Sequence, residues 1–427
     1  MKIIKIALLG LGTIGTGVLQ IIKDHQDKLF AITGSKIEVK RILVSHINKQ
    51  RNVNLNHIKL TQNINEIVND KEIQIVVEVM GTVLTAKKYI EKLLGVGKNI
   101  ITANKDLLAL YGTHLIKLAQ KKKCDLYYEA SVAGGIPILR TIVNSFAADK
   151  IVSVRGILNG TTNYILTKMT NDKQSYKKAL LSAQKSGYAE TNPINDISGQ
   201  DAAYKMIILT RFAFGMSIGI NNFKITGIKN IEEDDIKQAQ YLGYVIKLLG
   251  TSQLVNNHLN VSVEPLFVPK SHPLASINYE NNAILVSGAA VGQTVFYGPG
   301  AGKFPTANSV LSDLIAVTKN IALHTTGTPF NSYIQNGEKA SPKEIKSPYY
   351  FALEVKDHPG QMAKITKIMG DTKVSLHNII QTELNNKYAK IITTTYKINE
   401  VQLQNILKKI KLLKGIKLTA HYKILDK

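Results

Sequence analysis

Residues 3–15 read IIKIALLGLGTIG, a short apolar run followed at once by a G-x-G-x-x-G pattern at Gly10, Gly12 and Gly15. The run predicts a buried strand, and the residues after it, as far as Phe30, predict a helix. In this context Gly10 permits a tight turn, Gly12 lets the backbone approach a pyrophosphate, and Gly15 allows the helix to pack closely on the strand. The stretch therefore predicts a dinucleotide-binding α/β domain at the start of the chain.

Further apolar runs predict the other strands of a parallel sheet, with helical patterns between them. These runs span residues 37–44, 73–80, 99–103 and 125–131. Ligands bind at the carboxyl edge of such a sheet, so we expect Thr82 and Lys105, which follow two of the runs, to lie there. A solvated loop lysine is an equally open interpretation of Lys105.

The segment after the second run bears on the choice of coenzyme. Residues 45–51 read SHINKQR and lack the acid that NAD enzymes usually place there for the ribose hydroxyls. Lys49 and Arg51 are suited to a 2′-phosphate, which favours NADP and leaves NAD open. Lys40 and Arg41 are alternative contacts near the adenosine.

The stretch GYAETNPINDISGQDAAYKMIILT, residues 187–210, combines a polar turn with a helical pattern. Asp201 and Lys205 are four residues apart and share one helical face, and Glu190 lies in the turn ahead of them. An ordinary solvent-exposed ion pair is one interpretation. The other is a site in which two carboxylates hold an ammonium group and a lysine donates a proton.

Two glycine-containing turns are further candidates. EASVAGGIP, residues 129–137, offers several carbonyls and one carboxylate, which predicts either a hard-cation site or a helix-capping turn. The turn GPGAG ends at Gly302, and the helical pattern after it, residues 305–323, is expected to pack back on the first domain. That packing would bring Gly302 near the coenzyme.

The C-terminal part reads as a separate module. Residues 326–348 are rich in glycine and proline and predict a linker. Residues 349–427 then follow the order β-α-β-β-α-β, which is the ferredoxin-like split unit. We therefore expect four parts: a dinucleotide-binding domain (1–135), a catalytic and dimerisation domain (136–325), the linker, and the C-terminal domain.

Composition limits the possible partners of this 427-residue chain. The net charge is +23, but the 54 Lys and Arg residues include only five arginines, and no dense basic arm argues for nucleic acid. The absence of a long apolar run argues against a membrane span. One cysteine, Cys124, fits a reducing cytoplasm, and the N-terminus reads as a first strand rather than a signal peptide.

Together these motifs resemble the homoserine dehydrogenases, in the monofunctional form with a C-terminal ACT domain. The resemblance covers essentially the whole chain. It rests on the glycine loop (10–15), TANK (102–105), EASVAGGIP (129–137), GILNGTTNYI (156–165), GYAE (187–190), GQDAAYK (199–205), YGPGAG (297–302) and DHPGQMA (357–363). It implies an N-terminal Rossmann domain, an α+β catalytic domain and a ferredoxin-like ACT domain.

The resemblance also implies the reaction and its residues. The family interconverts L-aspartate 4-semialdehyde and L-homoserine in threonine, methionine and isoleucine biosynthesis, with hydride transfer to or from NADP or NAD. Lys205 would be the proton donor, assisted by Lys105, with a pKa lowered by burial and a neighbouring cation. Substrate binding is assigned to Gly187, Glu190, Asp201 and Lys205, coenzyme binding to Gly10, Gly12, Thr13, Ile14, Gly15, Thr82, Lys105 and Gly302, and a sodium-type cation to Glu129, Val132, Gly134 and Ile136.

Some points depart from the family or stay open. Asn192 and His46 stand where acids are common in the family. A thioester-forming semialdehyde dehydrogenase needs a nucleophilic cysteine, and Cys124 reads as a packing residue. A non-enzymatic amino-acid sensor is the other alternative. We expect a homodimer or tetramer, and the ACT domain implies an amino-acid effector, with threonine the natural candidate, or a role in assembly alone.

Overall fold

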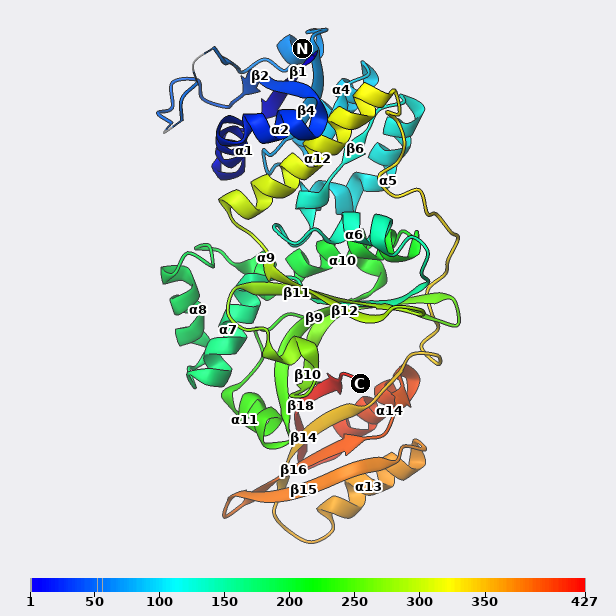
Figure 1. Cartoon of the computed structure of the whole chain (residues 1–427). Helices are drawn as coiled ribbons and strands as arrows, with labels where there is room; N and C mark the ends of the chain where they lie inside the picture. Colours follow the sequence, from blue (N-terminus) through cyan, green and yellow to red (C-terminus); the bar gives the residue numbers. More distant parts are fainter. Residues whose placement is uncertain (1, 52, 56, 427) are drawn as a thin grey trace. The chain divides into compact units, whose positions relative to one another are not determined.

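Parallel strands form the N-terminal sheet of the computed structural model, in the order β3-β2-β1-β4-β5-β6 (Figure 1). The strands are β1 (Lys2–Leu9), β2 (Ser35–Leu43), β3 (Lys59–Thr61), β4 (Ile73–Glu78), β5 (Asn99–Thr102) and β6 (Leu126–Tyr127). The order reverses direction between β1 and β4, which is the doubly wound Rossmann arrangement. The predicted parallel sheet is therefore confirmed.

The structure describes residues 2–51, 53–55 and 57–426, which fold as two units. The first unit contains the chain up to Gly160, together with Asp201–Phe223 and Glu280–Asn336. The second contains Thr161–Gln200, Lys224–Tyr279 and the chain from Gly337 onward. The chain thus enters each unit more than once.

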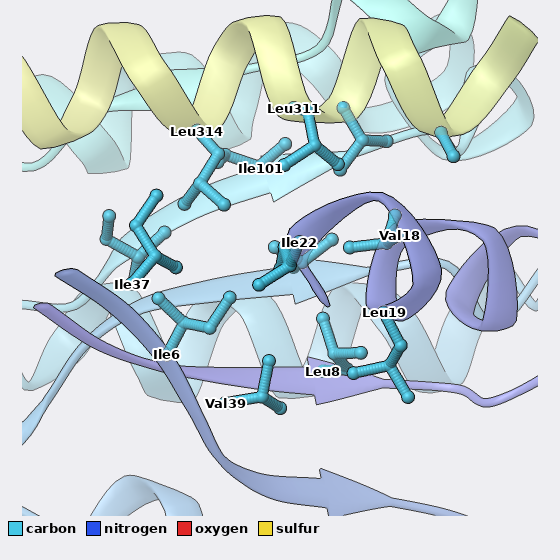
Figure 2. Packing of buried hydrophobic residues seen from close by; sticks show 14 of the residues in the cluster. Ile6, Leu8, Val18, Leu19, Ile22, Ile37, Val39, Ile101, Leu311 and Leu314 are labelled. Atoms are coloured by element: carbon cyan, nitrogen blue, oxygen red, sulfur yellow. The ribbon is translucent and has the colours of Figure 1, made fainter. Parts of the chain in front are cut away.

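Three helices pack on the parallel sheet in the first unit. The helix predicted as far as Phe30 is interrupted at His25, giving α1 (Thr13–Asp24) and α2 (Gln26–Thr33). As predicted, α12 (Lys303–Leu323) returns from late in the sequence and packs on the first domain. Figure 2 shows the shared apolar core, which includes Ile6, Leu8, Val18, Ile22, Ile37, Val39, Ile101, Leu311 and Leu314.

The strand predicted over residues 125–131 is shorter than expected. Only Leu126–Tyr127 pairs in the sheet, and Glu129–Ser131 forms a turn of 3₁₀ helix, η1. The main-chain N–H of Glu129 donates to Asp313 at 2.8 Å, and the Glu129 side chain is bonded to the next helix, α6 (Ile138–Ser145). These bonds turn the chain where an extended strand was predicted.

The rest of the first unit adds helices and an antiparallel sheet. The helices are α3 (Asn65–Val68), α4 (Leu84–Gly95), α5 (Lys105–Lys121), α10 (Gln200–Phe214) and the short η2 (Ile220–Asn222). The antiparallel strands are β7 (Ile151–Ile157), β11 (Asn281–Gly288) and β12 (Gly292–Pro299), with β11 between the other two. α5 and α10 carry the side chains of the candidate site.

The second unit contains a long hairpin and several helices. β9 (Tyr244–Val255) and β10 (His258–Pro269) pair antiparallel, and β8 (Lys224–Ile225) pairs with β10. The helices are α7 (Gly160–Asn171), α8 (Tyr176–Lys185), α9 (Ile194–Ile197), α11 (Glu233–Tyr241) and η3 (Pro273–Ser276).

The C-terminal module has the predicted ferredoxin-like fold. Its elements are β14 (Tyr349–Lys356), α13 (Gln361–Asp371), β15 (Leu376–Asn385), β16 (Tyr388–Thr395), α14 (Glu400–Lys411) and β18 (Ile416–Ile424), with a small β13 (Lys346–Ser347) and β17 (Ile398–Asn399) pair. The strand order β18-β14-β16-β15 places the first and last strands side by side. Among the described residues, no helix has both the length and the apolar character needed to cross a bilayer.

Candidate active site

The glycine loop between β1 and α1 has the geometry that its three glycines require. Gly10 adopts φ +104°, and a Cβ there would lie 2.9 Å from the Val79 carbonyl oxygen. A Cβ at Gly15 would lie 2.4 Å from the Gly10 carbonyl oxygen, so only glycine allows this close approach. At Gly12 nothing lies within 4 Å of the Cβ position, and this residue precedes the first turn of α1. The loop thus leaves room for an anion before the α1 N-terminus.

A hydrogen-bonded network organises the carboxyl ends of β4 and β5. The fully buried Glu78 accepts from the Thr102 hydroxyl at 2.6 Å and from the Met80 N–H at 2.8 Å. The Asn104 main-chain N–H donates to the Thr102 hydroxyl oxygen at 3.0 Å, and the Asn104 side-chain amide donates to the Thr82 carbonyl at 2.8 Å. Burial raises the pKa of Glu78. The network fixes the loops that carry Thr82 and Lys105.

Lys105 begins α5 directly after this network. The Asn104 side chain caps the helix by accepting from the Leu107 N–H at 3.1 Å. A cation in the first turn of a helix is opposed by the helix dipole. Here the Lys105 ammonium lies 3.3 Å from Asp106 and 3.3 Å from Asp201, so two carboxylates offset that cost.

Asp201 joins Lys105 and Lys205 into one cluster. Its Oδ1 lies 3.3 Å from the Lys105 Nζ, and its Oδ2 accepts from the Lys205 Nζ at 2.8 Å. The Asn159 amide also donates to Oδ2 at 2.8 Å, and the Lys205 Nζ donates to the Leu158 carbonyl at 2.6 Å. Both Leu158 and Asn159 directly follow β7. The end of one strand and the starts of two helices therefore meet at a single carboxylate.

The electrostatics of the cluster follow from its burial. Burial alone would raise the pKa of Asp201, but the ammonium groups of Lys205 and Lys105 and the Asn159 amide lower it to about 2. Burial likewise lowers the pKa of Lys105, yet Asp201 and Asp106 outweigh it, and the net shift is upward.

The Asp201–Lys205 pair is largely buried. Asp201 is only 8% exposed, and the side chain of Lys205 is 12% exposed, so the pair is not a solvent-exposed ion pair of an open helix face. The structure also brings Lys105, from far earlier in the sequence, to the Asp201–Lys205 pair. Glu190 and Gly187 lie in the second unit, on an exposed turn after α8, and their roles remain predictions.

The basic residues near the second strand are held in different ways. Arg51 folds back on its own loop, where its guanidinium donates to the carbonyls of His46, Ile47 and Lys49 at 2.5–3.0 Å. Lys49 is exposed. Arg51 therefore shapes the loop, and Lys49 is the more available cation.

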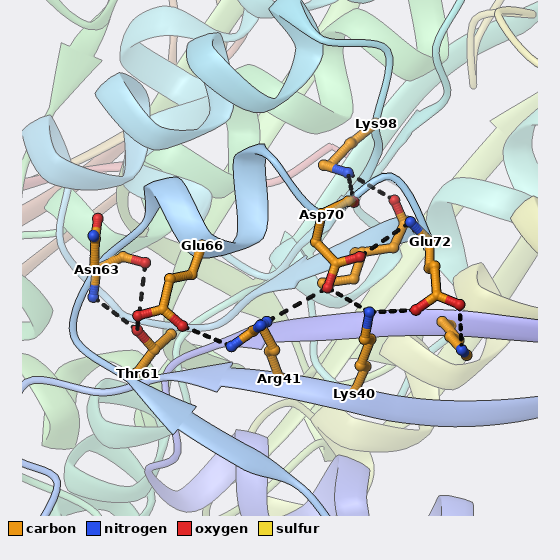
Figure 3. Close-up of polar contacts among 10 residues, drawn as sticks. Lys40, Arg41, Thr61, Asn63, Glu66, Asp70, Glu72 and Lys98 are labelled. Atoms are coloured by element: carbon orange, nitrogen blue, oxygen red, sulfur yellow. Dashed lines mark hydrogen bonds and ion pairs between the residues drawn. The ribbon is translucent and has the colours of Figure 1, made fainter.

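Lys40 and Arg41 belong to an acidic network instead (Figure 3). Lys40 pairs with Asp70 at 2.6 Å and with Glu72, and the Arg41 guanidinium lies 2.6 Å from Glu66. Burial would raise the pKa of Asp70, but Lys40 lowers it overall. These contacts leave little reason to assign Lys40 or Arg41 to an adenosine site.

The turn at 129–137 has a clear structural use for its carboxylate. Glu129 is fully buried, and its two oxygens accept from the Leu139 and Arg140 N–H groups at 2.9 and 2.7 Å, which caps the start of α6. Burial raises the pKa of Glu129 to about 7. Among the described residues, no group of three or more His, Cys, Asp or Glu side chains is placed to hold a metal ion. Any cation at this turn would have to rely on main-chain carbonyls.

Gly302 lies at the start of α12, where φ is +122°. One residue later, the Lys303 carbonyl approaches α1 so closely that a Cβ at Gly17 would lie 2.9 Å from it. The packing of α12 therefore brings Gly302 close to the helix that starts at the glycine loop.

Sequence reasoning missed three residues of the site. Glu78 interrupts an otherwise apolar strand, and a lone acid in such a run was an available signal. Asn104 and Asn159 stood inside motifs that were recognised, but their side-chain bonds depend on loop geometry that the sequence does not show.

The chain was compared with known protein families and structures. A family model described as "Homoserine dehydrogenase" matches residues 137–315, and one described as "Homoserine dehydrogenase, NAD binding domain" matches residues 10–129. An ACT domain model matches residues 349–413.

Several relatives match over nearly their full length. The homoserine dehydrogenase of Bacillus subtilis is 42% identical over 412 residues, covering 96% of this chain and 95% of the relative. That of Lactococcus lactis is 42% identical over 425 residues, covering 99% of both chains. A solved homoserine dehydrogenase from Thiobacillus denitrificans superimposes with a TM-score of 0.95 at 34% identity, covering 100% of this chain and 99% of its own.

Proposed function

Because the chain belongs to the homoserine dehydrogenase family, whose enzymes interconvert L-aspartate 4-semialdehyde and L-homoserine with a nicotinamide coenzyme, we propose that Lys205 is its proton donor. One observation carries this proposal: two ammonium groups, from Lys105 and Lys205, converge on the single buried carboxylate of Asp201. A sensor would have no use for such a cluster. In the reduction direction, hydride addition to the aldehyde carbon leaves an alkoxide, and a nearby ammonium stabilises and protonates it.

The hydrogen bonds of Lys205 support its role. An ammonium group has three N–H donors. Asp201 and the Leu158 carbonyl accept two of them, at 2.8 and 2.6 Å. One donor is left for the substrate oxygen, and the other two fix the direction in which it points. In homoserine oxidation the same lysine, once deprotonated, takes the hydroxyl proton.

Lys105 and Asp201 complete the electrostatic setting. Because the pKa of Asp201 is about 2, the carboxylate stays ionised at any working pH and holds both lysines in place. Lys105 adds a second positive charge near the developing alkoxide. Because Asp201 raises the pKa of Lys105, that charge persists at neutral pH.

Substrate recognition is assigned to the turn and to the cluster. We propose that Glu190 binds the substrate α-ammonium together with Asp201, and that Gly187 lines the pocket. Glu190 is exposed, and φ of +76° at Gly187 gives the turn a conformation that favours glycine. The replacement of an acid by Asn192 removes one charge but leaves Glu190 and Asp201.

The glycine loop and its neighbours are proposed to hold the coenzyme. Gly10, Gly12, Thr13, Ile14 and Gly15 would surround the pyrophosphate at the α1 N-terminus. Thr82, Lys105 and Gly302 would lie toward the nicotinamide. When bound, the nicotinamide would supply or accept the hydride. We propose NADP as the preferred form, because Lys49 is exposed beside a strand end that lacks an acid.

A monovalent cation such as sodium is proposed at the η1–α6 turn. The carbonyls of Glu129, Val132, Gly134 and Ile136 would hold it, because both carboxylate oxygens of Glu129 already cap α6. The Gly134 carbonyl also accepts from the Ser309 hydroxyl at 2.6 Å, which fixes its direction. The cation would thus stabilise the turn and take no part in the chemistry.

We also propose a homo-oligomer, dimeric or tetrameric. β12 is an edge strand of its sheet, and Val295 and Tyr297 on it are 38% and 59% exposed. Sedimentation velocity should show an assembly that Tyr297→Glu disrupts, and a monomeric wild-type chain would refute this. The ACT domain indicates an effector, and we propose a small amino acid, with threonine as the first candidate to test by calorimetry.

The experiment that tests the main proposal follows the near-ultraviolet absorbance of reduced nicotinamide with L-homoserine. Lys205→Ala should lower kcat on the order of 10²-fold or more while the protein stays folded. The matched control is Lys168→Ala, which removes a lysine from another i,i+4 helical pair, with Asp172 at 2.7 Å. The control should keep normal turnover. Near-normal turnover of Lys205→Ala would refute the assignment.

A further inference from the structure

A cavity of about 170 Å³ lies in the first unit at the far ends of α5 and α10. Its walls come from the second half of α5, β6, the end of α10 and the segment 329–334. On α10 the nearest wall residue, Arg211, follows Lys205 by six positions, or roughly 9 Å along the axis. The cavity is therefore separate from the Lys105–Asp201–Lys205 cluster, although it shares both helices with it.

One side of the cavity is apolar and rigid. Cys124, Leu126, Tyr128 and Phe330 contribute to it and are all buried. The Phe330 ring stacks on Tyr127 at 4.5 Å and makes an edge contact with Tyr128 at 5.5 Å between ring centroids. Such aromatic packing holds the wall in place and suits a ligand with an apolar body.

The other feature is the guanidinium of Arg211. Its Nε and Nη1 atoms are buried and make no hydrogen bond, whereas the rest of the group contacts the Thr113 hydroxyl, 3.5 Å from Nη2, and hydrogen-bonds with the Tyr128 side chain. Within the part of the chain that the structure describes, no carboxylate lies at ion-pair distance from it. Leaving buried donors without acceptors is unfavourable, so the group is suited to an acceptor that arrives with a ligand.

Capping of α10 does not account for this arginine. The carbonyls of Arg211 and Phe212, in the last turn of the helix, already accept from the Asn331 amide at 3.1 Å each. The guanidinium lies instead against α5, where a Cβ at Gly112 would be 2.6 Å from its Nη1. The glycine thus makes room for the guanidinium beside α5.

We propose that this cavity binds a small monocarboxylate with an apolar body, whose carboxylate pairs with Arg211 and whose body packs on the aromatic wall. A guanidinium matches the two oxygens of a carboxylate in one plane. The volume is below the about 300 Å³ of typical small-molecule sites, which limits the ligand to roughly ten non-hydrogen atoms. An inorganic dianion would leave the apolar wall without a contact and is not the ligand that the cavity fits.

Binding would reach the catalytic cluster through shared helices. α5 begins at Lys105 and α10 carries Asp201 and Lys205, while the opposite ends of both helices line the cavity. A ligand that draws Arg211 toward it would shift α10 relative to α5 and change the 3.3 Å contact between Lys105 and Asp201. This consequence rests on the proposed roles of the lysines, whereas binding itself does not.

The test uses the full-length protein with benzoate as the probe and benzamide as its neutral counterpart, measured by calorimetry and saturation-transfer NMR. We expect one benzoate per chain and at least tenfold weaker binding of benzamide. Arg211→Met should weaken benzoate at least tenfold, and Arg211→Lys, which keeps the charge, should weaken it less. The control is Lys121→Met, which removes an exposed charge on α5 outside the cavity and should change the affinity less than twofold.

The outcomes separate this inference from the proposed function. Benzoate should bind equally well to Lys205→Ala and in the presence of L-homoserine, which shows that it does not occupy the active site. The proposal is overturned if folded wild-type protein does not bind benzoate, if folded Arg211→Met and Arg211→Lys both bind it as wild-type does, or if phosphate displaces it at equal concentration. Loss of turnover in Lys205→Ala with benzoate binding intact would support both conclusions independently.

Discussion

Replacing Asp201 by asparagine removes one negative charge from between two positive ones while keeping the size of the side chain. The carboxylate is 8% exposed and lies 2.8 Å from Lys205 and 3.3 Å from Lys105. At an effective dielectric constant of about 20, each contact corresponds to a gross attraction of roughly 5–6 kcal/mol. The desolvation of Asp201 cancels much of this, so the net effect is better taken from its pKa.

That pKa falls from 3.8 to about 2, which corresponds to about 2–3 kcal/mol of net stabilisation of the charged form. In Asp201→Asn this amount is lost, and the two ammonium groups repel each other. Burial then acts on Lys105 with only Asp106 to oppose it, so the pKa of Lys105 should fall. We expect kcat to decrease by roughly 10²-fold, because the lysines lose the carboxylate that orients them toward the substrate oxygen.

The assay is the pH dependence of kcat/KM for semialdehyde reduction, which needs the positive charge of Lys105 beside the developing alkoxide. In wild-type protein the activity should persist into the alkaline range, and in Asp201→Asn its alkaline limb should move to lower pH by one unit or more. The matched control is Asp106→Asn, which removes a carboxylate at the same 3.3 Å from Lys105 but one that raises the pKa of Lys105 less than Asp201 does. The control should shift the limb by less than half a unit. An equal shift in both variants, or no shift in Asp201→Asn, would refute the reasoning.

Three shorter predictions concern stability and the coenzyme. Burial raises the pKa of Glu129 to about 7, so with rising pH this carboxyl group loses its proton in the unfolded chain before it does so in the folded protein. The free energy of unfolding should therefore fall by about 3 kcal/mol between pH 4.5 and 7. If a cation binds at the η1–α6 turn, this decrease in the free energy of unfolding should be smaller in sodium chloride than in choline chloride. Glu129→Gln should remove the dependence of the free energy of unfolding on pH. Lys49→Ala should lower kcat/KM with NADP⁺ roughly tenfold and leave NAD⁺ unchanged, and equal losses would exclude a 2′-phosphate contact. Gly12→Val should abolish coenzyme binding, measured by nicotinamide fluorescence, without lowering the melting temperature.

The sheet and the modules were predictable because they depend on local patterns. The apolar run before Gly10 and the run that ends near Thr102 each correspond to a strand of the parallel sheet. The C-terminal β-α-β-β-α-β order appears in the structure with boundaries within a few residues of those predicted. The failure at residues 125–131 has a non-local cause, since Glu129 is drawn into bonds with α6 and Asp313.

The residues of the Lys105–Asp201–Lys205 cluster were easier to predict from the sequence than their pKa shifts. Lys105, Asp201 and Lys205 were all identified, but the sign of the pKa shift at Lys105 depends on which charge is nearer, and sequence spacing does not contain that distance. Arg211 gave no signal at all, because an arginine near the end of an apolar helix usually reaches solvent. Only the placement of Gly112 and Asn331 shows that its guanidinium is enclosed.

The comparison of two i,i+4 pairs shows why the spacing alone could not decide the site. Lys168–Asp172 and Asp201–Lys205 have the same separation in sequence and nearly the same distance, 2.7 and 2.8 Å. The side chain of Asp172 is 36% exposed and that of Asp201 is 10% exposed, and only Asp201 also touches a second lysine, from α5. Water competes for the Lys168–Asp172 pair and dissolved salt screens it, whereas the Asp201–Lys205 pair lies in a site from which water is largely excluded. The function of Asp201 therefore arises from the packing of α10 next to the start of α5. Lys168→Ala breaks an i,i+4 ion pair that lacks this packing, so any additional loss of turnover in Lys205→Ala is due to the packing and not to the loss of an ion pair.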